Sequence, residues 1–186
     1  MRVLILILQL LFVCAAVHAA EDKLPFTPVS DPLTLPRTAL IETTQGEIEI
    51  EFYRENAPVT VEGFVQLVKK EFYNNLLFHY YVPQYVVQGG DPLGTGKGGP
   101  GYTLPPEFSE LKHRSGTIGM ARMPSQTNVE RRSNGSQFYI CLNDAPHLDG
   151  MYTIFAHVIR GMDNARKLRR GDKILRVLLP VNEATT

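Results

Sequence analysis

Alternation of apolar and polar residues predicts β-strands over much of the chain. Between Glu47 and Phe52, three apolar side chains alternate with three glutamates, which is the two-residue period of a strand with one buried face. The glutamates recur at the exposed period, so we interpret them as a solvated face rather than a metal site. Other apolar runs bounded by turn residues occur at 39–43, 78–82, 85–87, 117–120, 137–142, 153–159 and 173–179.

The period changes to that of a helix in two places. From 59 to 70, apolar residues recur at i, i+3, i+4 and i+7, and Asn56 is the expected N-cap. A second, short helix is expected over 162–170, ending at Gly171. Many short strands with only two helices predict an all-β dominated fold, an antiparallel sheet closed into a barrel.

The first residues have the pattern of a targeting signal. Arg2 precedes an apolar run over 3–13, and Ala19 ends a small-residue cleavage site, which predicts a signal peptide at 1–19. The run is short for a transmembrane span, so a cleaved signal is favoured over a signal anchor. A lipoprotein signal at Cys14 is disfavoured because Val13 is not small. The expected location is secreted or in the lumen of the secretory pathway, with no membrane attachment after cleavage.

A proline-rich segment separates this signal from the β pattern. Residues 20–38 contain four prolines, which favour extended chain, so we interpret the segment as a linker or spacer arm. The domain is expected over 39–180, followed by a tail at 181–186. That tail contains no KDEL-type sequence, which disfavours receptor-read retention.

Composition narrows the function classes. The 186 residues are enough for one domain with a sizeable core, expected to be a monomer. Nineteen basic and nineteen acidic residues balance, so no global field favours nucleic acid. After signal cleavage, Cys141 would be the only thiol, and its apolar strand predicts inert packing rather than a nucleophile. Histidine and cysteine spacing indicates no metal site, and no cofactor is expected.

The most informative segment runs from 78 to 91 and reads FHYYVPQYVVQGGD. Pro83 interrupts the strand, and a glutamine that ends the next apolar run before two glycines indicates an amide directed into a groove. The segment resembles the signature of the cyclophilins, cyclosporin-binding prolyl isomerases, usually F-H-R-x-x-x-x-F-x-x-Q-G-G-D. It matches at Phe78, His79, Gln88, Gly89, Gly90 and Asp91, conservatively at Tyr85, and it has Tyr80 in place of the family's catalytic arginine.

Later segments extend the resemblance to about residue 180. M-A-R at 120–122, N-G-S-Q-F-Y at 134–139, and L-D-G at 148–150 with Tyr152 resemble the family's pocket segments. The resemblance implies an eight-stranded antiparallel barrel closed by two α-helices. It implies Tyr80, Gln88 and Arg122 as catalytic residues, with Arg122 or Arg131 as a charged substitute for the missing arginine. It implies substrate contacts from Tyr85, Val86, Ala121, Gln137, Tyr139, His147, Leu148 and Tyr152.

Two further expectations follow from the same segments. His147 stands where many cyclophilins use tryptophan to bind cyclosporin, so binding of that drug is expected to be weak if it occurs at all. Asn134 begins an N-glycosylation sequence, but its place in the pocket motif favours a structural use.

Three functions remain open at this point. The first is a prolyl isomerase of the secretory pathway that assists protein folding on proline-containing polypeptides, with activity reduced by Tyr80. The second is a catalytically degenerate proline-peptide binding module. The third is a scaffold that carries the proline-rich arm, which the retained glutamines and aromatic pocket disfavour. Tyr80 discriminates the first two, because a neutral hydroxyl donor contributes about 0.5–1.5 kcal/mol against 1.5–3 kcal/mol for a charged donor.

Overall fold

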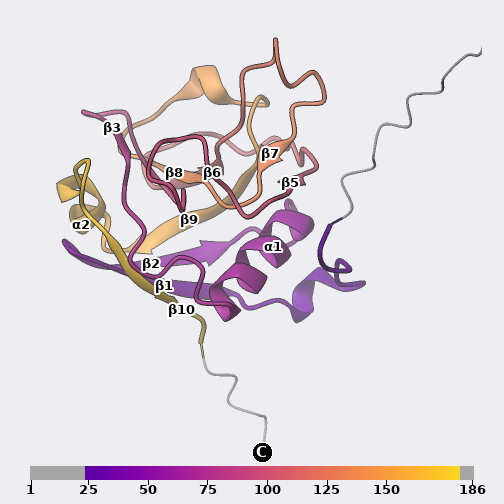
Figure 1. Ribbon diagram of the computed structural model, residues 1–186, viewed down its shortest axis with the longest axis horizontal. Helices are drawn as coiled ribbons and strands as arrows, with labels where there is room; N and C mark the ends of the chain where they lie inside the picture. The colour runs from indigo at the N-terminus through magenta and orange to yellow at the C-terminus, as the bar shows by residue number, and fades with distance from the viewer. Residues whose placement is uncertain (1–23, 181–186) are drawn as a thin grey trace, which may run out of the picture.

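The computed structural model describes residues 24–180, so the predicted signal peptide and tail lie outside the described part of the chain. One curled antiparallel sheet has the strand order β10-β1-β2-β9-β6-β8-β4-β3, and β5 pairs with β7 separately (Figure 1). The strands are β1 (Thr38–Thr43), β2 (Gly46–Phe52), β3 (Tyr80–Val82), β4 (Val86–Gly89), β5 (Thr103–Leu104), β6 (Thr117–Met120), β7 (Ser133–Asn134), β8 (Phe138–Cys141), β9 (Ile154–Arg160) and β10 (Ile174–Leu178).

The barrel closes between the residues that precede β3 and those that precede β10. Leu77 and Lys173 form an antiparallel bridge. The Phe78 N–H donates to the Asp172 carbonyl at 2.8 Å, and the Gly171 N–H donates to the Phe78 carbonyl at 2.9 Å. The predicted eight-stranded barrel is therefore confirmed, but β3 begins at Tyr80 rather than at 78, because the backbone of Phe78 is used to close the barrel.

The two helices, α1 (Pro58–Lys69) and α2 (Met162–Lys167), lie on different sides of the curled sheet (Figure 1). The second ends three residues before the predicted end, because Leu168 turns to φ −55° and ψ 140°. The expected cap of the first is wrong as well. Ala57, not Asn56, is its N-cap residue, and that residue's side chain makes no capping hydrogen bond.

A distant carboxylate caps α1 instead. Glu107 accepts hydrogen bonds from the N–H groups of Val59 and Thr60 at 2.9 and 2.8 Å, and from the Thr60 hydroxyl at 2.6 Å. The first N–H groups of a helix have no hydrogen-bond partner within the helix itself, and Glu107 supplies one. The helix N-terminus also favours a negative charge nearby. Burial raises the pKa of Glu107, and the hydrogen bonds from Thr60 and Val59 oppose that rise. The contact ties the loop after β5 to the helix.

The segment predicted as a linker or spacer arm packs on the barrel where the structure describes it. A short 3-10 helix, η1 (Pro32–Thr34), precedes Leu35, whose side chain is buried. Arg54 donates from one guanidinium nitrogen to the carbonyls of Leu33 and Leu35 at 2.8 and 2.9 Å. Phe26 packs edge-on against Tyr102 with the ring centroids 6.3 Å apart. Apolar side chains between the prolines thus extend the core over α1.

The glutamates of β2 face solvent in part and pair with arginines. Arg37 contacts Glu51 at 2.6 Å, and Arg160 contacts Glu49 at 2.5 Å. Both arginines are largely exposed, and such surface pairs contribute about 0–1 kcal/mol each. Within residues 24–180, no helix combines the length and the apolar character that crossing a membrane requires.

Candidate functional site

Four residues on neighbouring strands form a row across the sheet at the candidate site. Tyr80 of β3 pairs with Gln88 of β4, which pairs with Tyr139 of β8, which pairs with Gly119 of β6. Residues directly opposite one another in a sheet project from the same face, and the next residue along each strand projects from the other. Val87, the neighbour of Gln88 in β4, therefore projects from the opposite face and belongs to the main core. The sheet register therefore brings the two predicted catalytic positions of β3 and β4 together with the aromatic residue of β8.

Glycine at position 119 makes room for the Tyr139 ring. A Cβ atom at this position would overlap the Tyr139 hydroxyl group and its ring carbon. The tyrosine side chain can therefore lie across β6, and its exposed fraction falls to 5%. A glycine inside a strand commonly marks such a close approach.

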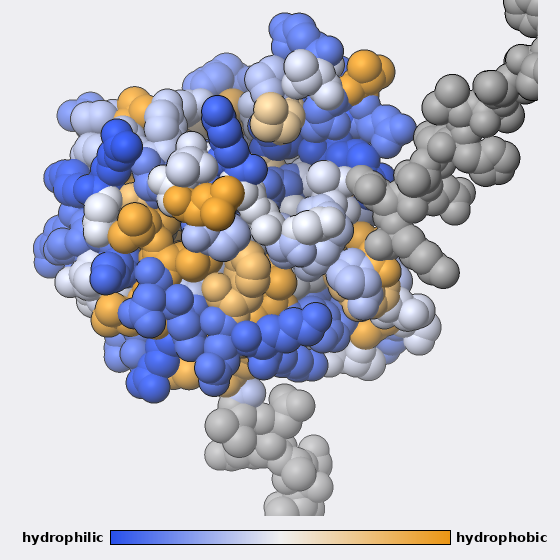
Figure 2. Space-filling model, viewed as in Figure 1, coloured by the Kyte–Doolittle hydropathy of each residue, from blue (hydrophilic) through white to orange (hydrophobic). Residues whose placement is uncertain are grey.

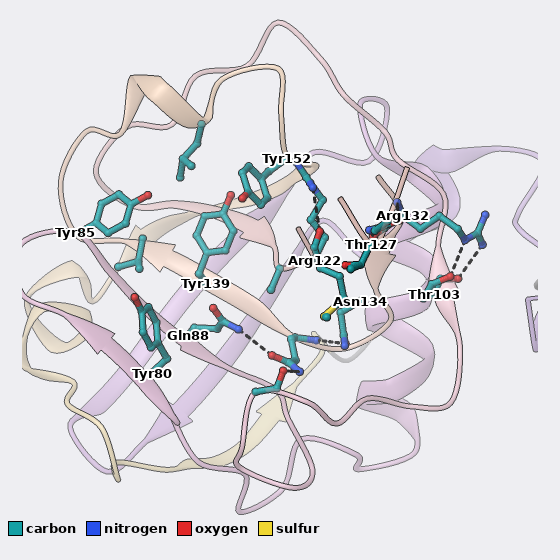
Figure 3. A pocket seen from close by; sticks show the side chains of 17 residues that line it. Tyr80, Tyr85, Gln88, Thr103, Arg122, Thr127, Arg132, Asn134, Tyr139 and Tyr152 are labelled. Carbon is teal, nitrogen blue, oxygen red and sulfur yellow. Dashed lines mark hydrogen bonds between the residues drawn. The ribbon is translucent and has the colours of Figure 1, made fainter. Parts of the chain in front are cut away.

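A pocket of about 510 Å³ lies along this row (Figure 3). Ten of the eleven predicted site residues line it, namely Tyr80, Tyr85, Val86, Gln88, Ala121, Arg122, Gln137, Tyr139, Leu148 and Tyr152. Seven further lining residues were not singled out as site residues from the sequence, namely Gly96, Thr103, Met123, Thr127, Asn128, Arg132 and Asn134. Most of these belong to loops and to the β5–β7 pair, whose packing against the groove has no local sequence pattern.

The aromatic side of the pocket is a small apolar cluster separate from the main core. Val86, Tyr139, Cys141 and Ala145 are its buried members, and Tyr85, Leu148 and Tyr152 pack against them. The Tyr139 and Tyr152 rings meet edge to face, with centroids 6.0 Å apart and planes at 88°. Burial raises the pKa of the Cys141 thiol to about 12, so the predicted inert role of this residue fits its surroundings. The cluster forms a concave apolar surface of the kind that a proline ring requires.

A buried histidine, His113, forms a hydrogen bond with the Tyr139 hydroxyl. His113 Nδ1 lies 3.0 Å from Asp149 Oδ1, and its Nε2 lies 2.9 Å from the Tyr139 hydroxyl oxygen. Because the carboxylate only accepts, the neutral ring carries its proton on Nδ1, and the Tyr139 hydroxyl donates to Nε2. Burial lowers the pKa of His113, and Asp149 opposes that shift. His113 lies 26 positions from Tyr139 and was not predicted from the sequence, because no motif marks it.

The amide side of the pocket is a chain of neutral hydrogen bonds. Gln88 Nε2 donates to Gln137 Oε1 at 2.8 Å, and Gln137 Nε2 donates to the carbonyls of Gly96 and Gly98 at 3.1 and 2.7 Å. Asn134 donates to the same Gly98 carbonyl at 3.0 Å, and its Oδ1 accepts from the Gln137 N–H at 2.9 Å. Both ends of the Asn134 amide are thus used inside the folded site, which favours the structural interpretation over glycosylation.

The predicted charged substitutes do not lie beside Tyr80. Arg122 and Tyr80 stand on different sides of the pocket, with Tyr139 between them (Figure 3). The Arg122 guanidinium lies 4.6 Å from the centroid of the Tyr152 ring, and it donates to the Met151 carbonyl at 3.1 Å. Arg131 is not among the lining residues, and its guanidinium lies 6.0 Å from the Phe108 ring centroid.

His147 is the one predicted substrate contact that does not line the pocket. Its Nε2 lies 2.8 Å from the Tyr85 hydroxyl oxygen, and the two rings stack with centroids 5.4 Å apart. It belongs to the short 3-10 helix η2 (Pro146–Leu148), whose Leu148 does line the pocket. In this structure it supports the ring of Tyr85 at the pocket's end.

Comparison with known proteins agrees with this geometry. Residues 38–182 match the family described as cyclophilin type peptidyl-prolyl cis-trans isomerase/CLD. A peptidyl-prolyl cis-trans isomerase of Synechococcus elongatus is 41% identical over 148 residues, which are 78% of this chain and 98% of that protein. Peptidyl-prolyl cis-trans isomerase-like 3 of Gallus gallus is 41% identical over 150 residues, 78% of this chain and 84% of that protein.

Solved structures give the same result. A cyclophilin type peptidyl-prolyl cis-trans isomerase of Cryptosporidium parvum superposes with a TM-score of 0.71 at 29% identity, covering 79% of this chain and 99% of that one. A second structure of that protein, in the presence of the dipeptide Ala-Pro, has a TM-score of 0.69 and covers 78% of this chain and 99% of that one. With its barrel, its groove and these relatives, the chain belongs to the cyclophilin-type peptidyl-prolyl cis-trans isomerases.

Proposed function

We propose that this isomerase acts on X–Pro bonds of folding or exported chains in the secretory pathway, with activity reduced by Tyr80. The observation that carries the reduced activity is the strand register, which puts Tyr80 directly opposite Gln88 at the rim of the pocket. The Cryptosporidium parvum relative was solved in the presence of Ala-Pro, which supports proline-containing peptides as the ligand here.

The chemistry requires no nucleophile. The barrier to rotation about a peptide bond, about 18–20 kcal/mol, comes from amide resonance. A site accelerates the rotation when it binds the twisted amide better than either planar form. It needs an apolar seat for the proline ring, a hold on the flanking backbone, and a donor that draws the proline nitrogen's lone pair out of conjugation. Each 1.4 kcal/mol supplied to the twisted form gives about a tenfold rate.

The two sides of the pocket can supply the first two parts. Tyr139, Leu148 and Tyr152 form the apolar seat. Gln88 presents its amide from the same row of the sheet, so it lies within reach of the peptide backbone beside the ring. These features support binding of proline peptides independently of the third part.

The third part is the one that has changed. Tyr80 is 49% exposed, and in Figure 3 its hydroxyl is directed toward the Tyr85 end of the pocket. A hydroxyl can donate a hydrogen bond, but a neutral donor contributes about 0.5–1.5 kcal/mol where a charged donor contributes 1.5–3 kcal/mol. Removing a preorganised transition-state donor in other enzymes costs about 10²–10³ in rate. We therefore expect a slow isomerase rather than an inactive one.

The test is the rate of cis-to-trans conversion of a proline tetrapeptide by residues 20–186, followed in a protease-coupled assay. The proposal predicts acceleration above the uncatalysed rate and a loss of that acceleration in Gln88→Ala. Gln66→Ala is the matched control, because this glutamine lies on α1 and lines no part of the pocket. Peptide binding without acceleration would select the alternative, a degenerate binding module.

The cellular location needs its own experiment. Arg2 and the apolar run over 3–13 support entry into the secretory pathway. Expression of the full chain in secreting cells should yield a product whose mass corresponds to cleavage after Ala19. Leu6→Arg, which interrupts the apolar run, should abolish that cleavage. An uncleaved wild-type chain recovered from the cytosol would contradict the proposed location.

We propose that the protein acts as a monomer, and the face shown in Figure 2 agrees with this. Hydrophilic side chains surround several small apolar areas on the face shown in Figure 2. Stable interfaces usually bury a larger continuous apolar centre. Sedimentation at micromolar concentration should give the mass of one chain, and a dimer would contradict this part of the proposal.

A further inference from the structure

The orientation of the Gln88 amide follows from atoms that can only accept hydrogen bonds. The carbonyls of Gly96 and Gly98 both accept from Gln137 Nε2, so the NH₂ end of Gln137 must face them. The Oε1 end of Gln137 then faces Gln88 and accepts from Gln88 Nε2 at 2.8 Å. The order of donors and acceptors along the chain is therefore fixed from its backbone end.

His79 takes the second hydrogen of the Gln88 amide. Its Nε2 lies 3.4 Å from Gln88 Nε2, a nitrogen that donates and cannot accept. The histidine nitrogen must then be the acceptor, so the ring is neutral with its proton on Nδ1. With both amide hydrogens occupied, by Gln137 and by His79, Gln88 offers its Oε1 to the groove. Gln88 is thus set up to accept a backbone N–H of the substrate.

The surroundings of His79 oppose its protonation on balance. The side chain is buried, and burial lowers its pKa below the ordinary value for histidine. Asp91, the Leu77 carbonyl and a hydrogen bond with Gln137 raise the pKa, whereas Arg170, which lines a hollow beside the pocket together with His79, lowers it. Asp91 is itself engaged, since its carboxylate accepts from the N–H groups of Leu93 and Thr95 at 2.8 Å.

A proton on Nε2 disturbs the hydrogen bonds of the Gln88 amide. Protonated His79 would carry a hydrogen on both ring nitrogens: Nδ1 has no hydrogen-bond partner within residues 24–180, and Nε2–H would face the NH₂ group of Gln88. Rotating the Gln88 amide would satisfy His79 but bring two oxygens together, because Gln137 cannot rotate without losing Gly96 and Gly98. The Gln88 amide loses one hydrogen bond in either orientation, and in the rotated orientation the groove meets a donor instead of an acceptor.

We propose that His79 is a positioning residue that holds the Gln88 amide with its oxygen toward the groove, and that proton uptake by His79 weakens substrate binding. The inference rests on the proposed function only for the identity of the ligand, a proline-containing peptide. It assigns to His79 a role beyond packing and predicts a pH dependence of binding for a reaction that itself transfers no proton.

The first experiment uses the unmodified protein. Nitrogen-15 chemical shifts of the His79 ring at neutral pH should show a neutral ring with its proton on Nδ1. Both side-chain N–H resonances of Gln88 should shift together with the titration of His79. A proton on Nε2 at neutral pH, or Gln88 resonances that ignore the titration, would overturn the proposal. This test needs no bound peptide. If no proline peptide binds, that result would overturn the proposed function and not the role of His79.

The second experiment measures the dissociation constant of a proline tetrapeptide between pH 8 and pH 5. For the unmodified protein, we expect affinity to fall by about threefold to tenfold as His79 is protonated, the equivalent of one lost hydrogen bond. The His79→Gln variant can keep an acceptor near the Nε2 position, but its side chain does not titrate. This variant should therefore bind the peptide at neutral pH and lose most of the pH dependence of the dissociation constant.

His157→Gln is the matched control, because His157 lies on β9 and lines no part of the pocket. It should keep the full pH dependence of the unmodified protein. A His79→Gln protein that folds and retains that dependence would overturn the proposal and assign the effect to another histidine, such as His147 behind Tyr85.

Discussion

The aromatic side and the amide side of the pocket are held by different kinds of interaction. On the aromatic side, Tyr139 is connected through His113 to the carboxylate of Asp149, and the guanidinium of Arg122 covers Tyr152. On the amide side, the hydrogen bonds of Gln88 run through neutral groups to backbone carbonyls. Formal charges thus support one side, and a fixed order of donors and acceptors supports the other.

This difference bears on the proposed reduction of activity. The aromatic side seats the proline ring, and its supporting contacts are complete in the structure. Tyr80 lies on the amide side, where a charged donor would act on the twisted bond. Because the seat binds the planar and twisted forms alike, whereas the donor distinguishes them, the substitution should lower the rate more than it lowers affinity.

The largest effect is expected from removing the aromatic seat. Tyr139→Ala should lower the free energy of unfolding by about 3–5 kcal/mol, because a buried ring is lost and its space is not refilled. Tyr139→Phe keeps the ring but leaves His113 Nε2 without its donor, which should cost about 1–3 kcal/mol. Urea denaturation of both variants measures the difference. Equal losses would mean that the ring's packing contributes little.

The next effect is a loss of stability in mild acid. Burial lowers the pKa of both His79 and His113, so the unfolded chain binds protons that the folded chain does not. Their contribution is fully present above the unfolded histidine pKa, about 6.5, and is lost as the pH falls below it. Each histidine can contribute at most about 1.4 kcal/mol per pH unit. The urea concentration at the unfolding midpoint should therefore be lower at pH 5.5 than at pH 7.5.

Substitution of His113 tests how much the aromatic side of the pocket contributes to this loss of stability. His113→Gln removes the titrating group of the aromatic side and should reduce the pH dependence of the urea midpoint. A pH dependence that is the same in both proteins would show that His113 does not contribute to it.

The smallest effect concerns cyclosporin at the end of the aromatic side. His147 stacks on Tyr85 and offers less apolar area than an indole ring. His147→Trp should tighten cyclosporin binding by about two- to tenfold, the usual contribution of an added aromatic contact. Isothermal titration of both proteins measures it. Nanomolar binding by the unmodified protein would contradict the expectation of weak binding.

The sequence predicted the eight strands of the main sheet and most of the pocket, but neither β5 nor β7 and few of the contacts that support the pocket. Tyr80, Gln88 and Tyr139 could be predicted because short motifs mark them and strand register then aligns them. Glu107, 48 positions from Val59 along the chain, could not be predicted as the cap of α1. His113 likewise depends on a contact across 36 positions to Asp149. Hydrogen bonds between distant segments leave no periodic pattern.

The proline-rich segment shows the same limit in another form. Proline spacing correctly disfavours a regular strand there, but it does not show whether the apolar residues between the prolines find a surface. Leu35 and Phe26 find one, next to Arg54 and Tyr102. Packing of this kind depends on the finished barrel rather than on the local sequence.

The site lacks only a charged donor at position 80 if the proposed function is right, and Tyr80→Arg restores one. The measurement is the rate of cis-to-trans conversion of a proline tetrapeptide, with Tyr80→Phe as the matched variant and the fold checked by circular dichroism. Arginine should raise the catalytic efficiency about tenfold or more, and phenylalanine should lower it, while peptide affinity changes less in both. Unchanged rates in both variants, with the fold preserved, would contradict the account, because the donor at position 80 would then play no part in the reaction.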